Sequence, residues 1–286
     1  QLLGHPIELL IEDTYCSPEG GRNAAVNVVT RPQVVAIFGT TCSSAAVGAA
    51  KIISESGLVM VSGTNGAPDL TSVKGKPGEN WQPGYFRTIY NGATIGQAVA
   101  EFVYDELEVR QAATVNVGDV YTKGYVNSFE HRFSEMGGEV VFSGGINKGD
   151  SNMVPVLSAI SESGADLIFM PIFPPEGEYL VRQMVNVPGL DDVILVGAEA
   201  LLLESFVDSL GEFGRGMFFA GPVHMSNIDV DKLENDYKTT FGEYPQTADY
   251  GFAFDAANLI VDAIESVAAQ DGEGGLQIGR QRLRDE

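Results

Sequence analysis

Residues 34–50 read VVAIFGTTCSSAAVGAA: an apolar run, a turn rich in hydroxyl groups, and the start of a helical pattern. The next apolar run, 58–63, ends in a similar way, with Thr64, Asn65 and Gly66 directly after it. Strands that are apolar throughout and alternate with amphipathic helices are typical of a parallel sheet buried on both faces. The sequence therefore predicts an α/β fold with polar turns at the carboxyl ends of its strands.

This alternation of apolar runs and helical patterns continues through most of the chain. We expect strands at residues 7–12, 34–39, 58–63, 86–90, 112–118, 139–146, 166–172, 193–199 and 217–223. We expect helices near residues 20–30, 43–55, 93–108, 121–136, 152–163, 175–186, 201–210, 229–241 and 247–269. The simplest architecture is a set of βα units wound into two sheets.

The length of 286 residues allows two lobes, and two stretches rich in Gly and Pro indicate where the chain changes lobe. These stretches are 73–85 and 219–223. We expect one lobe from residues 1–89 and 221–286, interrupted by a second lobe of residues 90–220. Ligands of such sheets bind beyond the carboxyl ends of the strands, so functional residues are expected there.

The composition excludes several classes of function. The 17 basic and 39 acidic residues give a formal net charge of −22 at pH 7, which repels nucleic acids and anionic membranes. No apolar run approaches the roughly 20 residues that a transmembrane helix requires. The sequence begins without a signal peptide, so we expect that any targeting segment was removed or lies outside it.

The turn before the expected helix at 43–55 has two interpretations. A helix N-terminus with free amides and a hydroxyl at Ser43 is an anion site, whereas the turn taken alone favours a Ser43 that only caps its own helix. No GK[ST] follows, and Ser43 lacks a nearby base and a GxSxG elbow, which excludes a Walker loop and a nucleophile. Residues 64–66 are similarly either a plain turn or a close approach to a ligand.

Acidic and aromatic residues follow strands of the other expected lobe. Glu199 ends an apolar strand, where it is either exposed at the rim or paired with a cation or several donors. Asp119 and Tyr121 follow a second strand, Phe173 follows a third, and Asp249 begins the last long helix. These residues predict a cleft with aromatic walls and acidic points.

The two sets of residues have opposite polarity, which suits a zwitterion. An α-carboxylate would meet the helix N-terminus at Ser43, and an α-ammonium would meet Glu199 as the cleft closes. No nucleophile–base pair, metal cluster or phosphate loop occurs, so we expect a binding protein rather than an enzyme, without cofactor or metal.

The two cysteines, Cys16 and Cys42, are either unrelated thiols or a disulfide that closes a loop of about 26 residues. Both follow the end of an expected strand, which favours pairing. A disulfide would indicate an oxidising compartment. The three histidines lie far apart in the sequence and do not complete a zinc site with the cysteines.

Eight segments carry a resemblance to a known family. They are IEDTYCSPEGGRNAA (11–25), GTTCSSAAVGAA (39–50), LVMVSGTNGAPDLT (58–71), FRT (86–88), GDVYTKGY (118–125), ADLIFMPIFPPEG (165–177), VGAEA (196–200) and YGFAFDAANLI (250–260). In this order, over almost the whole chain, they resemble the periplasmic or extracellular solute-binding proteins of branched-chain amino-acid ABC transporters. The resemblance implies the two-lobed type I periplasmic binding protein fold, with the ligand in the cleft between the lobes.

The resemblance also implies roles for single residues. It implies a disulfide between Cys16 and Cys42. In the first lobe it implies carboxylate binding by Ser43, and α-carboxylate and α-ammonium contacts at Thr64 and Gly66. In the second lobe it implies aromatic walls at Tyr121 and Phe173, and ammonium binding by Glu199. Gly66 stands where family members often have Thr, so Thr64 or Asn65 would have to supply that hydroxyl or polar contact. Asp119 and Asp249 make the pocket less apolar than a leucine site, which favours a polar or basic side chain as an alternative.

The resemblance implies a function and its setting. We expect capture of an amino acid and its delivery to the membrane permease of an ABC transporter by hinge closure. The alternatives are the ligand-binding domain of a membrane receptor, and a binder of another carboxylate or an amide. We expect a monomer outside the cytoplasm, secreted or lipid-anchored. Family members begin with a strand and a helix before residues 4–13 and continue past residue 286 with further strands, so we expect the sequence to be a fragment or a processed form. Either the missing residues belong to the protein outside this sequence, or the fragment relies on something else in their place.

Overall fold

The computed structural model describes residues 1–222, 230–247, 249–272 and 274–286, which form two compact units. Unit 1 comprises Gln1–Tyr90 and Asp249–Glu286, and unit 2 comprises Asn91–Ala248. The first change of unit falls one residue from the expected 89/90. The second falls at 248/249 instead of 220/221, because the helix after the last strand is grouped with unit 2. The lobe limits expected from the sequence stay a prediction.

Unit 1 contains a short parallel sheet. Its elements are α1 (Pro18–Val29), β1 (Ala36–Phe38), α2 (Ser43–Glu55), β2 (Val59–Ser62), η1 (Pro68–Leu70), β3 (Ser72–Val73), β4 (Lys76–Pro77), β5 (Tyr85–Arg87), α9 (Tyr250–Val267), β11 (Ala269–Gln270), β12 (Leu276–Gln277) and α10 (Arg280–Asp285). The sheet has the order β1-β2-β5, and both pairings are parallel. The antiparallel ribbons β3–β4 and β11–β12 were not expected.

Unit 2 contains a larger parallel sheet. Its elements are α3 (Gly92–Asp105), β6 (Gln111–Asn116), α4 (Val120–Glu135), β7 (Glu139–Gly145), α5 (Val154–Ser163), β8 (Leu167–Met170), α6 (Glu176–Gln183), η2 (Met184–Asn186), β9 (Ile194–Ala198), η3 (Glu199–Leu201), α7 (Glu204–Leu210), η4 (Gly211–Gly214), β10 (Phe218–Ala220) and α8 (Val230–Phe241). The order is β10-β9-β8-β6-β7, with every pairing parallel. The expected α/β fold with parallel sheets is confirmed.

The expected strand at 7–12 is wrong. These residues belong to no strand, and the side chains of Leu9 and Ile11 are 80% and 86% exposed. A strand forms only where a neighbouring strand takes its backbone hydrogen bonds, and none of the described residues does so here. The strand expected at 217–223 is shortened to β10, and residue 223 lies outside the described residues.

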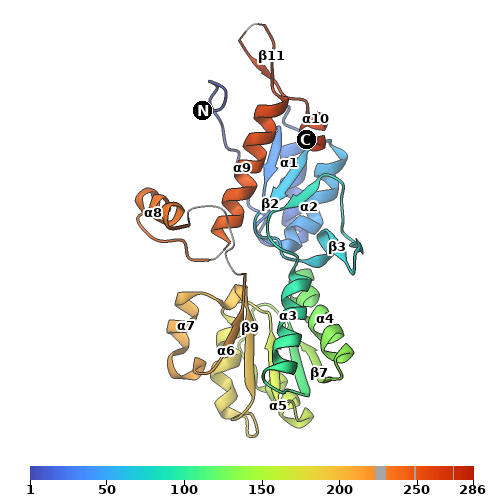
Figure 1. The fold of residues 1–286 in the computed structure, drawn as a ribbon, viewed down its shortest axis with the longest axis vertical. Helices are drawn as coiled ribbons and strands as arrows, with labels where there is room; N and C mark the ends of the chain where they lie inside the picture. The colour runs from blue at the N-terminus through green and yellow to red at the C-terminus, as the bar shows by residue number, and fades with distance from the viewer. Residues whose placement is uncertain (223–229, 248, 273) are drawn as a thin grey trace. The chain divides into compact units, whose positions relative to one another are not determined.

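Both faces of each sheet are covered by helices. In unit 2, Ile168 and Met170 of β8 join a core with Leu157 of α5, whereas Phe169 between them contacts the ring of Phe129 on α4 at 4.9 Å. Successive strand residues point to opposite faces, and Figure 1 shows α4 on one side of this sheet and α5 and α6 on the other. Residues 166–172 are almost all apolar because helices bury both faces of this strand.

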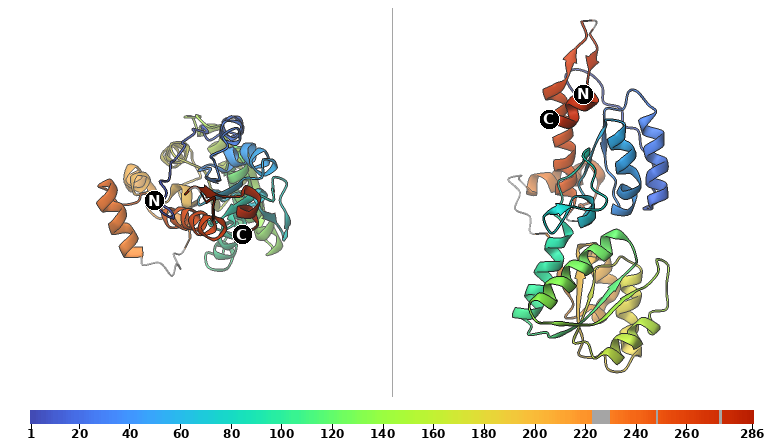
Figure 2. Two further views of the ribbon diagram at one scale, coloured as in Figure 1. Left: turned by 90° about the horizontal axis from the view of Figure 1, so that it is seen from above. Right: turned by 90° about the vertical axis from the view of Figure 1, so that its right-hand side faces the viewer.

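Unit 1 repeats this arrangement on a smaller scale. Val59 and Val61 of β2 pack with Ala256 and Ile264 of α9. Met60 lies between them, is fully buried, and points to the opposite face, which α2 covers. The right-hand view of Figure 2 shows the blue helices α1 and α2 on one side of the sheet and the red helix α9 on the other.

Each unit has a pair of helices that cross at a glycine. A Cβ on Gly48 of α2 would lie 1.9 Å from the carbonyl oxygen of Pro18 on α1. A Cβ on Gly96 of α3 would lie 2.5 Å from the carbonyl oxygen of Tyr125 on α4. Real Cβ atoms do not approach backbone so closely, so glycine sets the separation of both helix pairs.

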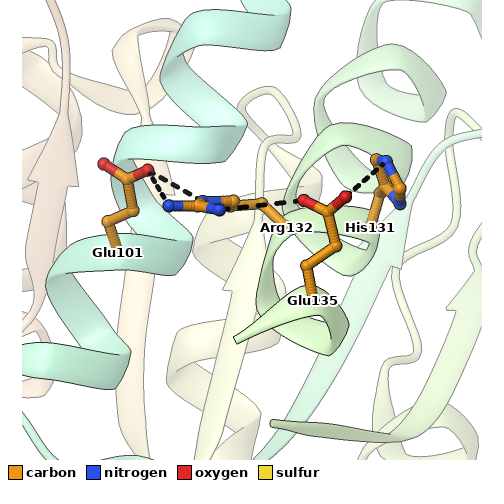
Figure 3. A network of polar contacts seen from close by, with 4 residues as sticks. All are labelled: Glu101, His131, Arg132 and Glu135. Atoms are coloured by element: carbon orange, nitrogen blue, oxygen red, sulfur yellow. Dashed lines mark hydrogen bonds and ion pairs between the residues drawn. The ribbon is translucent and has the colours of Figure 1, made fainter. Parts of the chain in front are cut away.

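The α3–α4 pair also carries a surface network of polar contacts. Arg132 donates from Nε and Nη2 to Glu101, both at 2.8 Å, and its Nη1 lies 3.8 Å from Glu135. The same Glu135 lies 3.4 Å from Nε2 of His131 (Figure 3). All four side chains are between 37% and 51% exposed, so each pair contributes at most about 1 kcal/mol.

Candidate functional site

The turns after β1 and β2 are held together by hydroxyl groups. Ser62, the last residue of β2, donates from Oγ to the carbonyl of Thr40 at 2.9 Å and accepts the N–H groups of Thr64 and Asn65 at 3.2 Å. Thr64 donates from Oγ1 to the carbonyl of Thr41 at 2.8 Å. The two turns singled out in the sequence therefore form one polar cluster at the carboxyl end of the unit 1 sheet.

Ser43 connects this cluster to helix α2. The N-cap of α2 is Cys42, without a side-chain cap, and Ser43 is the first helical residue. The Ser43 hydroxyl is buried and accepts the N–H of Ala67 at 3.2 Å, so the interpretation that Ser43 only caps its own helix is wrong. Within the described residues the N–H groups of Ser43 and Ser44 meet no acceptor. Such amides at a helix N-terminus favour an anion.

Asn65 supports the turn from inside. Its side chain is fully buried, and Oδ1 accepts hydrogen bonds from the hydroxyls of Tyr85 at 3.1 Å and Thr40 at 3.3 Å. Burial raises the pKa of the Tyr85 hydroxyl well above its usual range, so this group stays protonated and donates. Gly66 is buried as well. Asn65 therefore supports the turn with its side chain and with its backbone, because its N–H donates to Ser62 and its carbonyl accepts from Arg87.

Arg87, the last residue of β5, holds the same turn and was missed in the sequence. Its Nη1 donates to the carbonyls of Asn65 at 2.7 Å and Ala67 at 2.8 Å, and its Nη2 donates to the hydroxyl of Thr71. The signal that could have found it is a cation within an otherwise uncharged predicted strand; in the sheet it pairs with Ser62.

In unit 2 a carboxylate and three aromatic rings lie together. Glu199 follows β9, and its Oε1 accepts hydrogen bonds from the hydroxyl of Tyr121 at 2.8 Å and from that of Tyr125. The ring of Tyr121 lies 4.4 Å from that of Tyr125 and 5.3 Å from that of Phe173. The structure thus brings together Glu199, Tyr121 and Phe173, as expected of a common site.

Tyr125 was missed in the sequence. It is fully buried, and it follows Tyr121 by four residues on α4, which places both hydroxyls on one face of the helix. This spacing within the segment 118–125 is the signal that could have found it. Two phenol donors on one carboxylate oxygen fix its position.

The two aspartates have local structural roles. Asp119 is the N-cap of α4, and its Oδ1 accepts from the N–H of Thr122 at 2.7 Å and from the Thr122 hydroxyl at 2.8 Å. Asp249 precedes α9, and its carbonyl accepts the N–H of Ala253 at 2.9 Å. Asp119 belongs to unit 2 and Asp249 to unit 1. Their expected place in one pocket stays a prediction.

The expected disulfide is confirmed. Cys16 and Cys42 are bonded, with Cα atoms 5.2 Å apart, so the residue before Ser43 is fixed to the segment that leads into α1. Among the residues that the structure describes, no three His, Cys, Asp or Glu side chains are grouped to hold a metal ion. None of the described helices combines the length and the apolar character that crossing a membrane requires.

Comparison with known families and curated proteins gives consistent relatives. A family model described as periplasmic binding protein matches residues 1–281. The chain is similar to the leucine-, isoleucine-, valine-, threonine- and alanine-binding protein of Pseudomonas aeruginosa, with 24% identity over 280 residues, which cover 94% of this chain. The first two curated relatives are matched over 46% and 70% of their own length.

Solved structures of the same fold cover the whole chain. A leucine binding protein from Thermotoga maritima has a TM-score of 0.82 and 24% identity, over 100% of this chain and 77% of that one. A solute binding protein of an ABC transporter from R. palustris, solved with benzoate, has a TM-score of 0.81 and 19% identity, over 100% and 75%. These likenesses show the two-lobed fold.

Proposed function

Because this chain belongs to the periplasmic binding protein family, we propose that it binds an amino acid and presents it to the permease of an ABC transporter. The observation that carries the proposal is the opposite chemistry of the two strand-end clusters. Unit 1 offers helix amides and hydroxyls around Ser43, and unit 2 offers the carboxylate of Glu199. Helix N-termini attract anions and carboxylates attract cations, and an amino acid carries one of each.

We assign the α-carboxylate to unit 1. The N–H groups of Ser43 and Ser44 are the donors, joined by the hydroxyl of Ser43, whereas the hydroxyl of Thr64 donates to the Thr41 carbonyl and supports the turn. Gly66 contributes through its backbone, whereas Asn65 supports the turn, because its side chain is buried and its N–H and carbonyl are bonded to Ser62 and Arg87. Backbone donors at a helix start suit a carboxylate better than an apolar group.

We assign the α-ammonium to unit 2. Glu199 is the partner of the cation, and the rings of Tyr121 and Phe173 form an aromatic wall beside it. A branched apolar side chain fits such a wall. Asp119 and Asp249 add negative charge, which favours a polar or basic side chain as the second choice.

A non-amino-acid carboxylate is the second candidate, because a fold neighbour was solved with benzoate. An amine-free acid would bring no cation to Glu199 and would lack the ion pair that we assign to this carboxylate. We therefore rank amine-free acids and amides below amino acids as candidate ligands.

We place the protein outside the cytoplasm, where its disulfide persists, and we propose that it acts as a monomer.

The ligand-binding domain of a membrane receptor is the alternative role on the same fold. The gene's neighbours discriminate the two: permease and ATPase genes favour transport, and fusion to a transmembrane kinase favours a receptor. Light scattering at increasing concentration tests the monomer.

A thermal-shift screen tests the ligand class. The twenty amino acids, their amides and a set of aromatic acids are each added to the purified chain at 1 mM. A ligand at about a hundred times its Kd stabilises the folded state by about 2.7 kcal/mol, which raises Tm by several degrees. We expect amino acids to raise Tm most, with hits confirmed by calorimetry. Shifts by aromatic acids alone would contradict the proposal.

A further inference from the structure

The side chain of Arg87 contacts the turn that carries the proposed carboxylate-binding residues of unit 1, but it is not itself one of the proposed ligand contacts. Its Nη1 bonds two carbonyl oxygens, those of Asn65 and Ala67, which are two residues apart on the turn after β2. Its Nη2 bonds the hydroxyl of Thr71 beyond η1. One guanidinium therefore fixes three points of the segment 65–71.

The residues that Arg87 holds are themselves bonded to the proposed ligand contacts. The carbonyl of Ala67 accepts from Arg87, and the N–H of the same residue donates to the hydroxyl of Ser43. A rotation of the peptide units at 65–67 would break both contacts together. The orientation of the Ser43 hydroxyl and of the backbone at Gly66 thus depends on the bonds that Arg87 makes.

We propose that Arg87 is a positioning residue for the carboxylate half of the amino-acid site, acting through the segment 65–71 on Ser43 and Gly66. This inference rests on the proposed function. A lysine keeps the charge but lacks the planar fork that reaches two carbonyls and a hydroxyl at once. Arg87→Lys therefore isolates the geometric role from the charge.

Arg284 offers a matched control within unit 1. It also donates from a guanidinium to a backbone carbonyl, that of Ser54 at 3.1 Å, near the opposite end of α2 from Ser43. Arg284→Lys removes the same kind of contact from a place with no proposed ligand residue. Both variants are compared with the parent chain for melting temperature and far-UV circular dichroism.

The first readout is amide hydrogen exchange of the ligand-free chain, followed by mass spectrometry. We expect Arg87→Lys to speed exchange at least threefold in peptides that cover residues 64–71, and Arg284→Lys to leave these peptides unchanged. This readout does not depend on any ligand. Unchanged exchange at 64–71 in Arg87→Lys would overturn the inference, whatever the chain binds.

The second readout is calorimetry with L-leucine and with L-leucinamide, which keeps the ammonium but lacks the carboxylate. We expect Arg87→Lys to weaken L-leucine about tenfold and L-leucinamide less than twofold. Equal weakening of both probes would overturn the carboxylate assignment. If the parent chain binds no amino acid while residues 64–71 respond as expected, the proposed function fails and the positioning role of Arg87 stands.

Discussion

The carboxyl ends of the two sheets carry different chemical groups, and we propose that they attract opposite charges. In unit 1 the strands end in hydroxyls and backbone amides around Ser43, held from behind by Arg87. In unit 2 they end in the carboxylate of Glu199, held from behind by Tyr125. Both ends have the same parallel architecture, so we infer that the fold sets where the proposed ligand contacts lie and that the turn residues set which charge they would attract.

The largest expected effect removes the charge of unit 2. Glu199→Ala takes away the proposed partner of the ammonium, and breaking one side of a desolvated ion pair costs about 3–5 kcal/mol. We expect the Kd for L-leucine in calorimetry to rise more than a hundredfold. Glu212→Gln, an exposed carboxylate of the same unit, is the control. Equal affinity of the Ala variant and the parent for L-leucine would contradict the proposal that unit 2 binds the ammonium.

The next effect concerns the helix pairs that support each cluster. Gly48→Ala places a methyl group 1.9 Å from the Pro18 carbonyl, whereas Gly96→Ala places one 2.5 Å from that of Tyr125. We expect losses in the free energy of unfolding of about 3 and about 2 kcal/mol, because backbone must move in both cases. Urea unfolding measures both, and a Gly48→Ala variant as stable as the parent would contradict the close approach of α1 and α2.

Removing the phenol behind Glu199 has a smaller effect. Tyr125→Phe deletes one of the two donors to Oε1, and a hydrogen bond to a charged group contributes about 1.5 kcal/mol or more. We expect the Kd for L-leucine to rise about tenfold. Tyr104→Phe on α3 of the same unit serves as the control. If both variants bind alike, Tyr125 does not position the carboxylate.

The smallest effect is on the surface network of Figure 3. Arg132→Gln removes the contacts with Glu101 and Glu135, which are exposed to solvent. We expect a loss of less than about 1 kcal/mol in the free energy of unfolding and no change in ligand affinity. Urea unfolding at low and at 0.5 M salt measures it, and a loss above 2 kcal/mol would show that the network supports unit 2.

The order of strands and helices could be predicted because each buried strand is an apolar run with its own flanking helices. The strand expected at 7–12 was wrong because an apolar pattern does not show whether a neighbouring strand is present to pair with. Leu9 and Ile11 are exposed instead. Ser43 and Glu199 could be found since Ser43 lies in the turn after a strand and Glu199 directly follows one. Arg87 and Tyr125 escaped notice because they act through other residues, and only the fold shows which carbonyl or carboxylate they reach.

The most direct test of the opposite polarity is calorimetry of Glu199→Gln with L-leucine and with 4-methylpentanoate, the same molecule without its ammonium. In the parent chain we expect L-leucine to bind far more tightly than 4-methylpentanoate. In Glu199→Gln we expect the affinity for L-leucine to fall at least tenfold while that for 4-methylpentanoate stays within twofold, because the carboxylate half in unit 1 is intact. Equal losses for both probes, or no preference for L-leucine in the parent chain, would contradict the assignment of the ammonium to Glu199.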